Sequence, residues 1–491
     1  METNNIEPTQ SQEPTLKEKT AKGLFWGGFS NIFQQLISFG FGIYFARTLN
    51  DTDYGIVGML AIFTGIASAL VNSGFGVALI NKQDATDKDY NAVFWFTLFV
   101  GLFLYIALYF CAPLIAQFYR QPALINLSRV IFIGFFIGGI GTASSAIMVK
   151  QMKTKLWAMT DVISLLTASL VTFIMVFKGF GYWSLAIQSL LNISLVSLLR
   201  IIIITWKPTF SFNFAPLKPM LSFSIKIFLT SVTIKINENI FSALLGRFYT
   251  KSDVGNYVQG QKWMGMGQSF VGGMVTYVTQ PVLAQVNEDK ERQVNILRKL
   301  IRFGAFVSFP LMLGLAFIGR EFIIIAVTEK WLPALPYLQL FCVWGAIGFL
   351  STILINLIYT LGKSDIYLKV TIITCVLQLL TIVSLFRLGI FAMIIGYIVM
   401  NYMGILLWQY YANKLIELKL KDILKDIFPY LGITLLCFGI VWFITRNIQN
   451  LYLLLASKII ISGILYIFAL KISNSVIYKE SMEFLMNRIK K

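Results

Sequence analysis

RTLNDTDYG at residues 47–55 and RFYTKSDVG at residues 247–255 share an arginine, a threonine or serine, an aspartate and a glycine at an offset of 200 positions. Each stretch joins two long apolar segments of the chain. Two further pairs of markers follow in the same order: PAL at 122–124 and 333–335, and GYW at 181–183 with GIF at 389–391. Three ordered matches predict an internal duplication, so that the chain consists of two similar halves.

The composition is that of an integral membrane protein. Of the 491 residues 57% are hydrophobic and 13% are charged, whereas a soluble domain has about 25% charged residues. Long apolar stretches separated by short polar breaks predict fourteen transmembrane helices. They cover residues 23–47, 54–81, 89–119, 124–150, 156–179, 181–206, 219–247, 255–286, 294–328, 334–361, 364–387, 389–413, 425–446 and 449–471. The long span 294–328 is expected to bend near Gly314 or Gly319.

The predicted fold class is an all-α polytopic membrane protein with two six-helix lobes and two additional C-terminal helices. Six is an even number, so both lobes cross in the same direction and their pseudo-two-fold axis runs along the membrane normal. The predicted divisions are a disordered tail (1–22), an N-lobe (23–206), a cytoplasmic linker (207–218), a C-lobe (219–413), the last two helices with the basic loop before them (414–471) and a tail (472–491).

The basic residues report the topology of the chain. The formal charge is +18, and lysine and arginine concentrate in both tails and in every second loop. By the positive-inside rule both termini are predicted to be cytoplasmic. We therefore attribute the positive charge to membrane topology and not to a nucleic-acid-binding surface. The first 22 residues lack the apolar run of a signal peptide.

Several kinds of chemistry are excluded. The chain has no histidine, which removes Ser-His-Asp and Cys-His catalysis and the usual zinc and haem sites. Its four cysteines all fall in apolar runs, which is typical of small buried hydrophobic residues. We therefore expect no catalytic residue, no metal and no cofactor.

The span 219–247 has an unusual polar face. Ser231, Lys235, Glu238, Asn239 and Ser242 are spaced so that they share one side of a helix. A charge in hydrocarbon is costly and usually faces a cavity or a partner. Lys235 and Glu238 either neutralise one another as a structural pair or line a cavity. In the second case Glu238 is the candidate acid for coupling to a proton or sodium ion.

The first span carries the matching stripe. Asn31, Gln35, Ser38 and Gly42 correspond to Ser231, Lys235, Glu238 and Ser242 at the same offset of 200. Both halves are therefore expected to present polar groups to a shared central space. Span 255–286 adds Gln261, Lys262 and Gln268, and Lys262 either lines that space or extends outward to the interface. The candidate substrate-binding residues are Lys235, Lys262, Asn31, Gln35, Asn239 and Gln268.

The remaining charged residues have structural interpretations. The cations nearer helix ends are expected to be lipid-facing anchors; these are Arg129, Arg200, Lys226 and Lys458. Asp161 is expected to cap or pair near a cytoplasmic helix end. In the duplicated motif, Arg47 and Arg247 are expected to cap helix C-termini and Asp53 and Asp253 to be N-caps. Six cations and two acids within the spans predict a net cationic cavity suited to an anion.

The region 22–82 resembles a known family. Lys22-Gly23 leads into the first span, ARTLNDTDYGIVG follows at 46–58 and NSGFGVALI at 72–80. These stretches resemble the Wzx-type polysaccharide flippases of the multidrug/oligosaccharidyl-lipid/polysaccharide (MOP) superfamily, in the lipopolysaccharide, colanic-acid and teichuronic-acid exporter branch. The fourteen spans, the repeat and the final helix pair extend the similarity to nearly the whole chain.

The resemblance implies a transporter and not an enzyme. Such proteins move an undecaprenyl-diphosphate-linked oligosaccharide from the cytoplasmic to the outer leaflet of the bacterial inner membrane, for O-antigen, capsule or exopolysaccharide. Two lobes form a V around a basic cavity and rock to alternate access, with the polyprenyl tail beside a lateral gap. The implied partners are the lipid-linked oligosaccharide, the membrane and other polysaccharide-assembly proteins.

Other functions stay open at this point. A lipid II flippase would move a similar lipid-linked head group across the membrane, with a different sugar. A multidrug or cation antiporter of the same superfamily predicts acids facing inward in the first lobe, where this chain has amides. A membrane glycosyltransferase or polymerase needs a large outer loop, which the predicted spans leave no room for, and a scramblase or channel would move lipid without a gradient.

Overall fold

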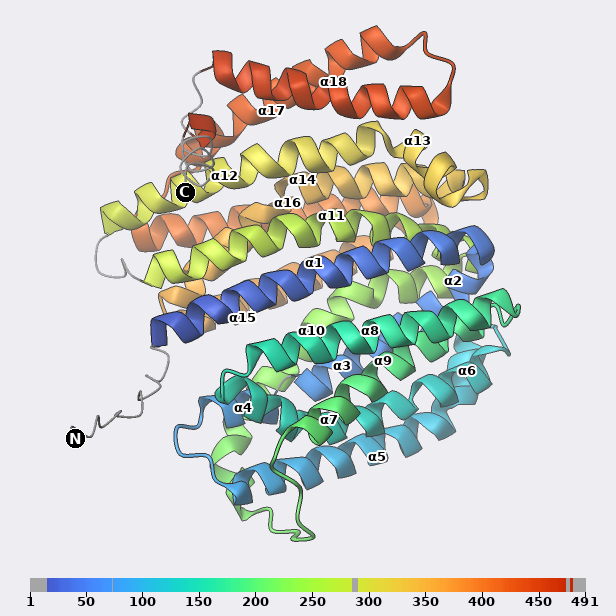
Figure 1. Cartoon of the computed structure of the whole chain (residues 1–491), viewed down its shortest axis with the longest axis vertical. Helices are drawn as coiled ribbons and strands as arrows, with labels where there is room; N and C mark the ends of the chain where they lie inside the picture. The colour runs from blue at the N-terminus through green and yellow to red at the C-terminus, as the bar shows by residue number, and fades with distance from the viewer. Residues whose placement is uncertain (1–15, 73, 285–289, 474–476, 480–491) are drawn as a thin grey trace, which may run out of the picture.

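Long helices laid side by side make up the molecule (Figure 1). The computed structural model describes residues 16–72, 74–284, 290–473 and 477–479. Within that part of the chain there is no strand, and eleven helices are long and apolar enough to cross a bilayer. This confirms an all-α polytopic membrane fold, although the predicted number of fourteen spans is not confirmed.

The N-lobe contains the first nine α-helices. They are α1 (Leu16–Thr48), α2 (Asp51–Met59), α3 (Ala61–Asn72), α4 (Phe75–Asn81), α5 (Asp87–Tyr119), α6 (Leu124–Ile131), α7 (Ile133–Lys150), α8 (Thr154–Phe177) and α9 (Tyr182–Ile203). Helix α1 begins before residue 23, so residues 16–22 of the predicted disordered tail are helical, while residues 1–15 lie outside the described part. The predicted span 54–81 is broken into α2, α3 and α4, and the span 124–150 into α6 and α7.

The C-lobe and the final pair follow a short linker. Their elements are η1 (Ala215–Leu217), α10 (Lys218–Phe248), α11 (Lys251–Ala284), α12 (Lys290–Phe317), α13 (Gly319–Phe322), η2 (Ile323–Val327), η3 (Glu329–Ala334), α14 (Leu335–Thr360), α15 (Ser364–Leu385), η4 (Phe386–Leu388), α16 (Ile390–Ile416), α17 (Leu420–Thr445) and α18 (Leu451–Ile472). The expected bend in span 294–328 lies at Gly319, where α12 gives way to α13. Residues 480–491 of the predicted tail lie outside the described part.

Three predicted spans fall outside the eleven apolar helices, two because they are polar and one because it is broken into short helices. Helices α1 and α11 have 33 and 34 residues, which is ample length for a crossing, but their sequences are rich in glycine, serine, asparagine and glutamine. The third is the broken α2–α4 segment. These three elements also border the cavities between the lobes.

The duplicated motif builds the same helix start twice. The backbone N–H of Asn50 donates to Asp53 Oδ2 over 3.0 Å, and that of Thr250 donates to Asp253 Oδ2 over 3.0 Å. The aspartates therefore occupy the third helical position of a capping box and are not the N-caps that the sequence predicted. Recurrence of this geometry at an offset of 200 supports the duplication.

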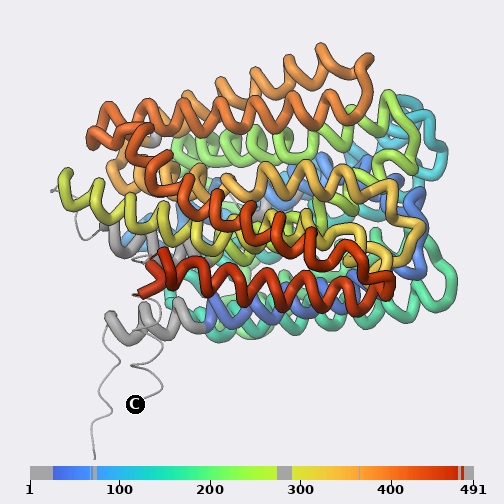
Figure 2. The backbone as a smooth tube through the Cα atoms, turned by 90° about the horizontal axis from the view of Figure 1, so that it is seen from above, coloured from blue at the N-terminus to red at the C-terminus, as the bar shows by residue number. Residues whose placement is uncertain are grey.

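The lobes lie next to each other with α1 between them. Figure 1 shows α1 between α8 of its own lobe and α11 of the other, and α17 and α18 along the outer side of the C-lobe. Helix α1 begins and α18 ends at one end of the bundle, which we call the proximal end; α1 ends at the opposite, distal end. The view in Figure 2 shows α17 and α18 crossing the C-lobe helices as a separate layer.

Candidate functional site

A cavity of about 480 Å³ lies between the lobes in their distal half, and we call it the distal cavity. Six elements of the N-lobe and two of the C-lobe, α10 and α11, surround it. Its polar lining comprises Ser38, Thr64, Gln188, Ser189, Asn192, Asn239, Ser242, Gln261 and Lys262. The polar faces of α1 and α10 that the sequence pairs at an offset of 200 therefore meet here, at Ser38 and Gly42 on one side and Asn239 and Ser242 on the other.

Lys262 is the cation of the distal cavity. Its ammonium lies 5.6 Å from the Tyr54 ring centroid and 5.0 Å from that of Trp263. A Cβ on Gly42 would lie 2.9 Å from the Lys262 nitrogen, so the glycine makes room for it. No carboxylate of the described residues pairs with it. Lys262 therefore lines the space between the lobes and does not extend outward to the interface.

A second, larger cavity of about 680 Å³ lies in the proximal half, between α1, α7 and α8 of the N-lobe and Ser269 of α11, and we call it the proximal cavity. The same face of α1 borders both cavities, because its proximal residues Asn31 and Gln35 are followed at helical spacing by Ser38 and Gly42 of the distal cavity. The predicted site residues Asn31 and Gln35 thus lie in the proximal cavity.

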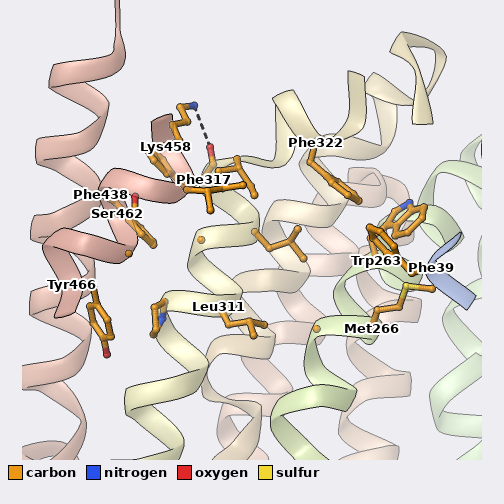
Figure 3. A pocket seen from close by; sticks show the side chains of 17 residues that line it. Phe39, Trp263, Met266, Leu311, Phe317, Phe322, Phe438, Lys458, Ser462 and Tyr466 are labelled. Atoms are coloured by element: carbon orange, nitrogen blue, oxygen red, sulfur yellow. Dashed lines mark hydrogen bonds between the residues drawn. The ribbon is translucent and has the colours of Figure 1, made fainter. Parts of the chain in front are cut away.

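An apolar groove leads sideways from the proximal cavity, and we call it the lateral groove. Its first part, about 360 Å³, lies between α1 and α11 and shares Asn31, Gln35 and Ser269 with the proximal cavity. Its second part, about 460 Å³, continues past Phe39 and Met266 to α12 and α18. Figure 3 shows this second part, with Leu311, Phe438 and Tyr466 along the groove and Lys458 at its edge. Nearly all of its surface is apolar.

Lys235 and Glu238 form the ion pair that one interpretation predicted. Lys235 Nζ lies 2.6 Å from Glu238 Oε2, and the two side chains are 37% and 51% exposed. The stem of Lys235 passes Gly65 on α3, where a Cβ would be 3.5 Å away. The pair therefore lies where α10 meets the N-lobe and is not sealed in a core. A role in substrate binding or coupling stays a prediction.

Gln268 lies apart from the other candidates. Its amide nitrogen would be 2.7 Å from a Cβ on Gly348 of α14, which places the side chain within the C-lobe. Helix α11 is 34 residues long, so its successive faces meet different neighbours, and the sequence pattern alone did not show which neighbour residue 268 faces.

Two of the predicted lipid-facing anchors are buried ion pairs, so that interpretation is wrong for them. Arg200 lies 2.6 Å from Asp161 and is 5% exposed, and Lys458 lies 2.9 Å from Glu321, with 10% and 5% exposed. Asp161 pairs near a helix end, as expected. Glu321 is a partner that the sequence interpretation did not predict, although an acid within span 294–328 is the signal that points to one. Lys226 is exposed, as predicted.

These pairs change the expected charge of the site. Arg200, Lys235 and Lys458 are each neutralised by a carboxylate. Among the residues that line the distal and proximal cavities, Lys262 is the single lysine or arginine. The expected excess of four positive charges is therefore reduced to one unpaired cation in an otherwise amide- and hydroxyl-lined space.

At the distal end hydrogen bonds connect the two lobes, and we call this set of contacts the distal bracket. Arg47 donates to the Ala326 and Ile325 carbonyls over 2.8 and 2.7 Å, and Arg247 donates to the Phe118 carbonyl. Each arginine caps a helix C-terminus, as predicted, but the helix belongs to the opposite lobe. On the same side Trp331 donates to the Ala46 carbonyl over 2.7 Å.

A lysine completes the distal bracket. Lys330 donates to the carbonyls of Arg47 and Leu49 over 2.7 and 2.8 Å. It satisfies the last carbonyls of α1, which carry the negative end of the helix dipole. In the proximal half the lateral groove separates α1 from α11. The lobes are therefore joined by hydrogen bonds at the distal end of α1 and separated by a groove at its proximal end.

The chain matches known proteins over most of its length. A model of the family described as "Polysaccharide biosynthesis protein" matches residues 44–336. The teichuronic acid biosynthesis protein TuaB of Bacillus subtilis is 25% identical, covering 72% of this chain and 74% of its own. The lipopolysaccharide biosynthesis protein WzxC of Escherichia coli is 22% identical, covering 72% and 73%.

Solved structures share the fold. The lipid II flippase MurJ in an inward closed conformation superposes with a TM-score of 0.75 at 16% identity, covering 94% of this chain and all of that one. At this identity the similarity concerns the fold alone, which is the two-lobe arrangement with a final helix pair. The family model covers more than half of the chain, so the chain belongs to the polysaccharide biosynthesis protein family.

Proposed function

We propose that the protein moves an undecaprenyl-diphosphate-linked oligosaccharide from the cytoplasmic to the outer leaflet of the bacterial cytoplasmic membrane. The relatives' names connect this family with teichuronic acid and lipopolysaccharide biosynthesis. Surface polymers of this kind are built on one side of a membrane and used on the other. Their sugars and phosphates cannot pass hydrocarbon unaided, because each unpaired polar group there costs several kcal/mol.

The observation that carries the proposal is the junction of a polar cavity with an apolar groove. Asn31, Gln35 and Ser269 line both the proximal cavity and the lateral groove. An amphiphile can therefore place its head between the lobes while its tail stays in the groove beside α1 and α11. Lys262 lies farther along the same space and supplies a positive charge for the diphosphate.

The distal bracket is the contact that breaks and re-forms as access alternates between the two sides of the membrane. With both termini cytoplasmic, as the basic loops predict, the distal end faces outward and the bracket closes that side. Release to the outer leaflet then requires Arg47, Arg247 and Lys330 to leave the carbonyls of the opposite lobe, while the proximal half closes. Exchange for a proton or sodium ion, with Glu238 as the acid, would drive the cycle.

Lys262→Gln tests the proposal in a strain that depends on this chain for its surface polymer. The substitution keeps a polar side chain that can donate hydrogen bonds, one bond shorter than that of lysine, but removes the charge. We expect loss of surface polymer and accumulation of the lipid-linked intermediate on the cytoplasmic side, measured by accessibility to an externally added glycosidase. The matched control is Lys226→Gln on the exposed face of α10, which should export normally. Normal export by Lys262→Gln would contradict the role of the cation.

Complementation separates the two flippase alternatives. The fold similarity to MurJ makes lipid II the second candidate substrate. Expression in cells depleted of their lipid II flippase should fail to restore growth if the substrate is a polysaccharide precursor. Restored growth would favour lipid II.

A further inference from the structure

We infer that the proximal cavity is a saccharide subsite that recognises a neutral or N-acetylated sugar of the transported head group, an inference that rests on the proposed function. Its lining combines the groups that bind sugars in water-filled sites. The polar members are Ser30, Asn31, Gln34, Gln35, Thr154, Asp161 and Ser269, and Trp157 borders the same space. At about 680 Å³ the cavity has the size of a small-molecule site.

The hydrogen-bonding chemistry of the lining suits hydroxyl groups. An amide side chain can donate and accept at once, and a carboxylate accepts strong hydrogen bonds from O–H donors. No hydrogen-bond partner is recorded for the side chains of Asn31 and Gln35 among the described residues, so both are available to a ligand. The indole of Trp157 adds a flat apolar surface of the kind that packs against the C–H face of a sugar ring.

The carboxylate is held in place from the side away from the cavity. Arg200 donates to Asp161 Oδ1 over 2.6 Å and to Ser145 Oγ over 2.9 Å, and its guanidinium carbon lies 3.5 Å from the Trp157 ring centroid. The arginine is 5% exposed, while Asp161 keeps 22% of its side chain exposed. One buried residue thus fixes both the acid and the indole that border the cavity.

The amides are positioned by the contact between α1 and α8. Gln34 donates to Ser30 Oγ over 2.9 Å, and Ser30 donates to the Ala158 carbonyl over 3.4 Å. Gln34 is eight positions before Gly42, the neighbour of Lys262, which is about 12 Å along the helix axis. A short oligosaccharide can bridge that separation, so a diphosphate near Lys262 and a sugar in the proximal cavity can belong to one molecule.

The charge of the lining selects the class of sugar. Its one ionisable residue is Asp161, and no lysine or arginine lines the proximal cavity. An acidic sugar would place its carboxylate near that of Asp161, whose arginine partner is buried behind it and already bound. The lining therefore favours neutral and N-acetylated sugars over uronic acids.

Binding to two lipids tests the subsite on the purified full-length protein. The probes are undecaprenyl diphosphate without sugar and the lipid-linked intermediate extracted from cells that lack this protein. We expect the wild type to bind the intermediate about tenfold more tightly than the bare lipid, a ratio that one or two net hydrogen bonds produce. Gln34→Leu and Asp161→Asn should remove most of that ratio and leave the affinity for the bare lipid unchanged. Gln449→Leu, at an exposed distal loop, is the matched control and should keep the ratio.

The outcomes separate the subsite from the proposed function. Equal affinity of the wild type for both lipids would overturn the subsite but leave the flippase proposal standing. Equal weakening of both lipids by Gln34→Leu and Asp161→Asn would show that the cavity is structural and would also overturn it. Absence of binding to either lipid would overturn the proposed function and the subsite together. Sugar analysis of the intermediate is the second check, and a unit made wholly of uronic acids contradicts the assigned sugar class.

Discussion

Gly55 and Gly255 each pack against the backbone of the other half of the molecule, at equivalent positions. A Cβ on Gly55 would lie 1.8 Å from the Lys251 carbonyl oxygen, and a Cβ on Gly255 would lie 1.9 Å from that of Asp51. The starts of α2 and α11 therefore cross with no side chain between them. The glycines of the repeated motif thus allow the close approach of the two lobes at their distal end.

Gly55→Ala should destabilise this crossing. The methyl group overlaps a backbone carbonyl that cannot move independently, and such overpacking costs about 1–3 kcal/mol. We expect a lower midpoint in the thermal unfolding of the detergent-purified protein. Gly40→Ala is the control, because nothing lies within 4 Å of a Cβ there, and alanine is the better helix former by roughly 0.5–1 kcal/mol. Equal midpoints for the two variants would contradict the close approach.

Removing the arginines of the distal bracket should open the distal end. In Arg47→Ala with Arg247→Ala the carbonyls of η2 and α5 lose their cross-lobe donors, so the outward-open form becomes more populated. The readout is the labelling of Ser189→Cys, in the distal cavity, by a membrane-impermeant thiol reagent added outside intact cells, in a background whose four native cysteines are replaced by alanine. We expect several-fold faster labelling than in the variant that carries Ser189→Cys and keeps both arginines.

The control for this experiment is an arginine at the same end. Arg320 is exposed, and no hydrogen bond or ion pair of its side chain is recorded in the described part of the chain. Arg320→Ala should leave the labelling rate of Ser189→Cys unchanged. If removal of Arg47 and Arg247 has no larger effect than this control, the bracket does not hold the distal end closed.

Glu238→Gln should reduce export without loss of stability. A pair with 37% and 51% exposed side chains contributes at most about 1 kcal/mol, so the unfolding midpoint should hardly change. We expect a fall in surface polymer, because the substitution removes the carboxylate that we propose as the coupling acid. The charge-swapped Lys235→Glu with Glu238→Lys separates the two interpretations: restored export would mean that only the pair matters, and normal export by Glu238→Gln would remove the coupling role.

Breaking the Lys458–Glu321 pair should be costly, because both partners are buried. Lys458→Met leaves a carboxylate without its cation, and removing one member of a buried pair costs about 3–5 kcal/mol. We expect a marked fall in the thermal unfolding midpoint, with α18 loosened from α13. The double variant Lys458→Met with Glu321→Gln should recover most of the loss. A double variant as unstable as the single one would show that the pair is not what holds α18.

Local patterns in the sequence determined much of the architecture. Apolar length predicted the crossings, and the motif at 47–55 and 247–255 predicted a duplication whose two capping boxes have the same geometry. Helical spacing placed Ser38 of α1 and Asn239 of α10 on polar faces that meet in the distal cavity. Such features depend on residues within a few turns of one another, and a helix of known period fixes which of its residues share a face.

The tertiary structure decided which charges and faces meet. Arg200 and Asp161 lie on α9 and α8, and Lys458 and Glu321 on α18 and α13, so their pairing depends on how whole helices pack. The same holds for Arg47, whose hydrogen bonds go to a carbonyl 279 positions away. The helical period within one segment does not encode these pairings, because helices of the same apolar composition can pack in many registers. A charge buried in the membrane is costly unless it is paired, so its partner is the group that the helix packing brings close to it.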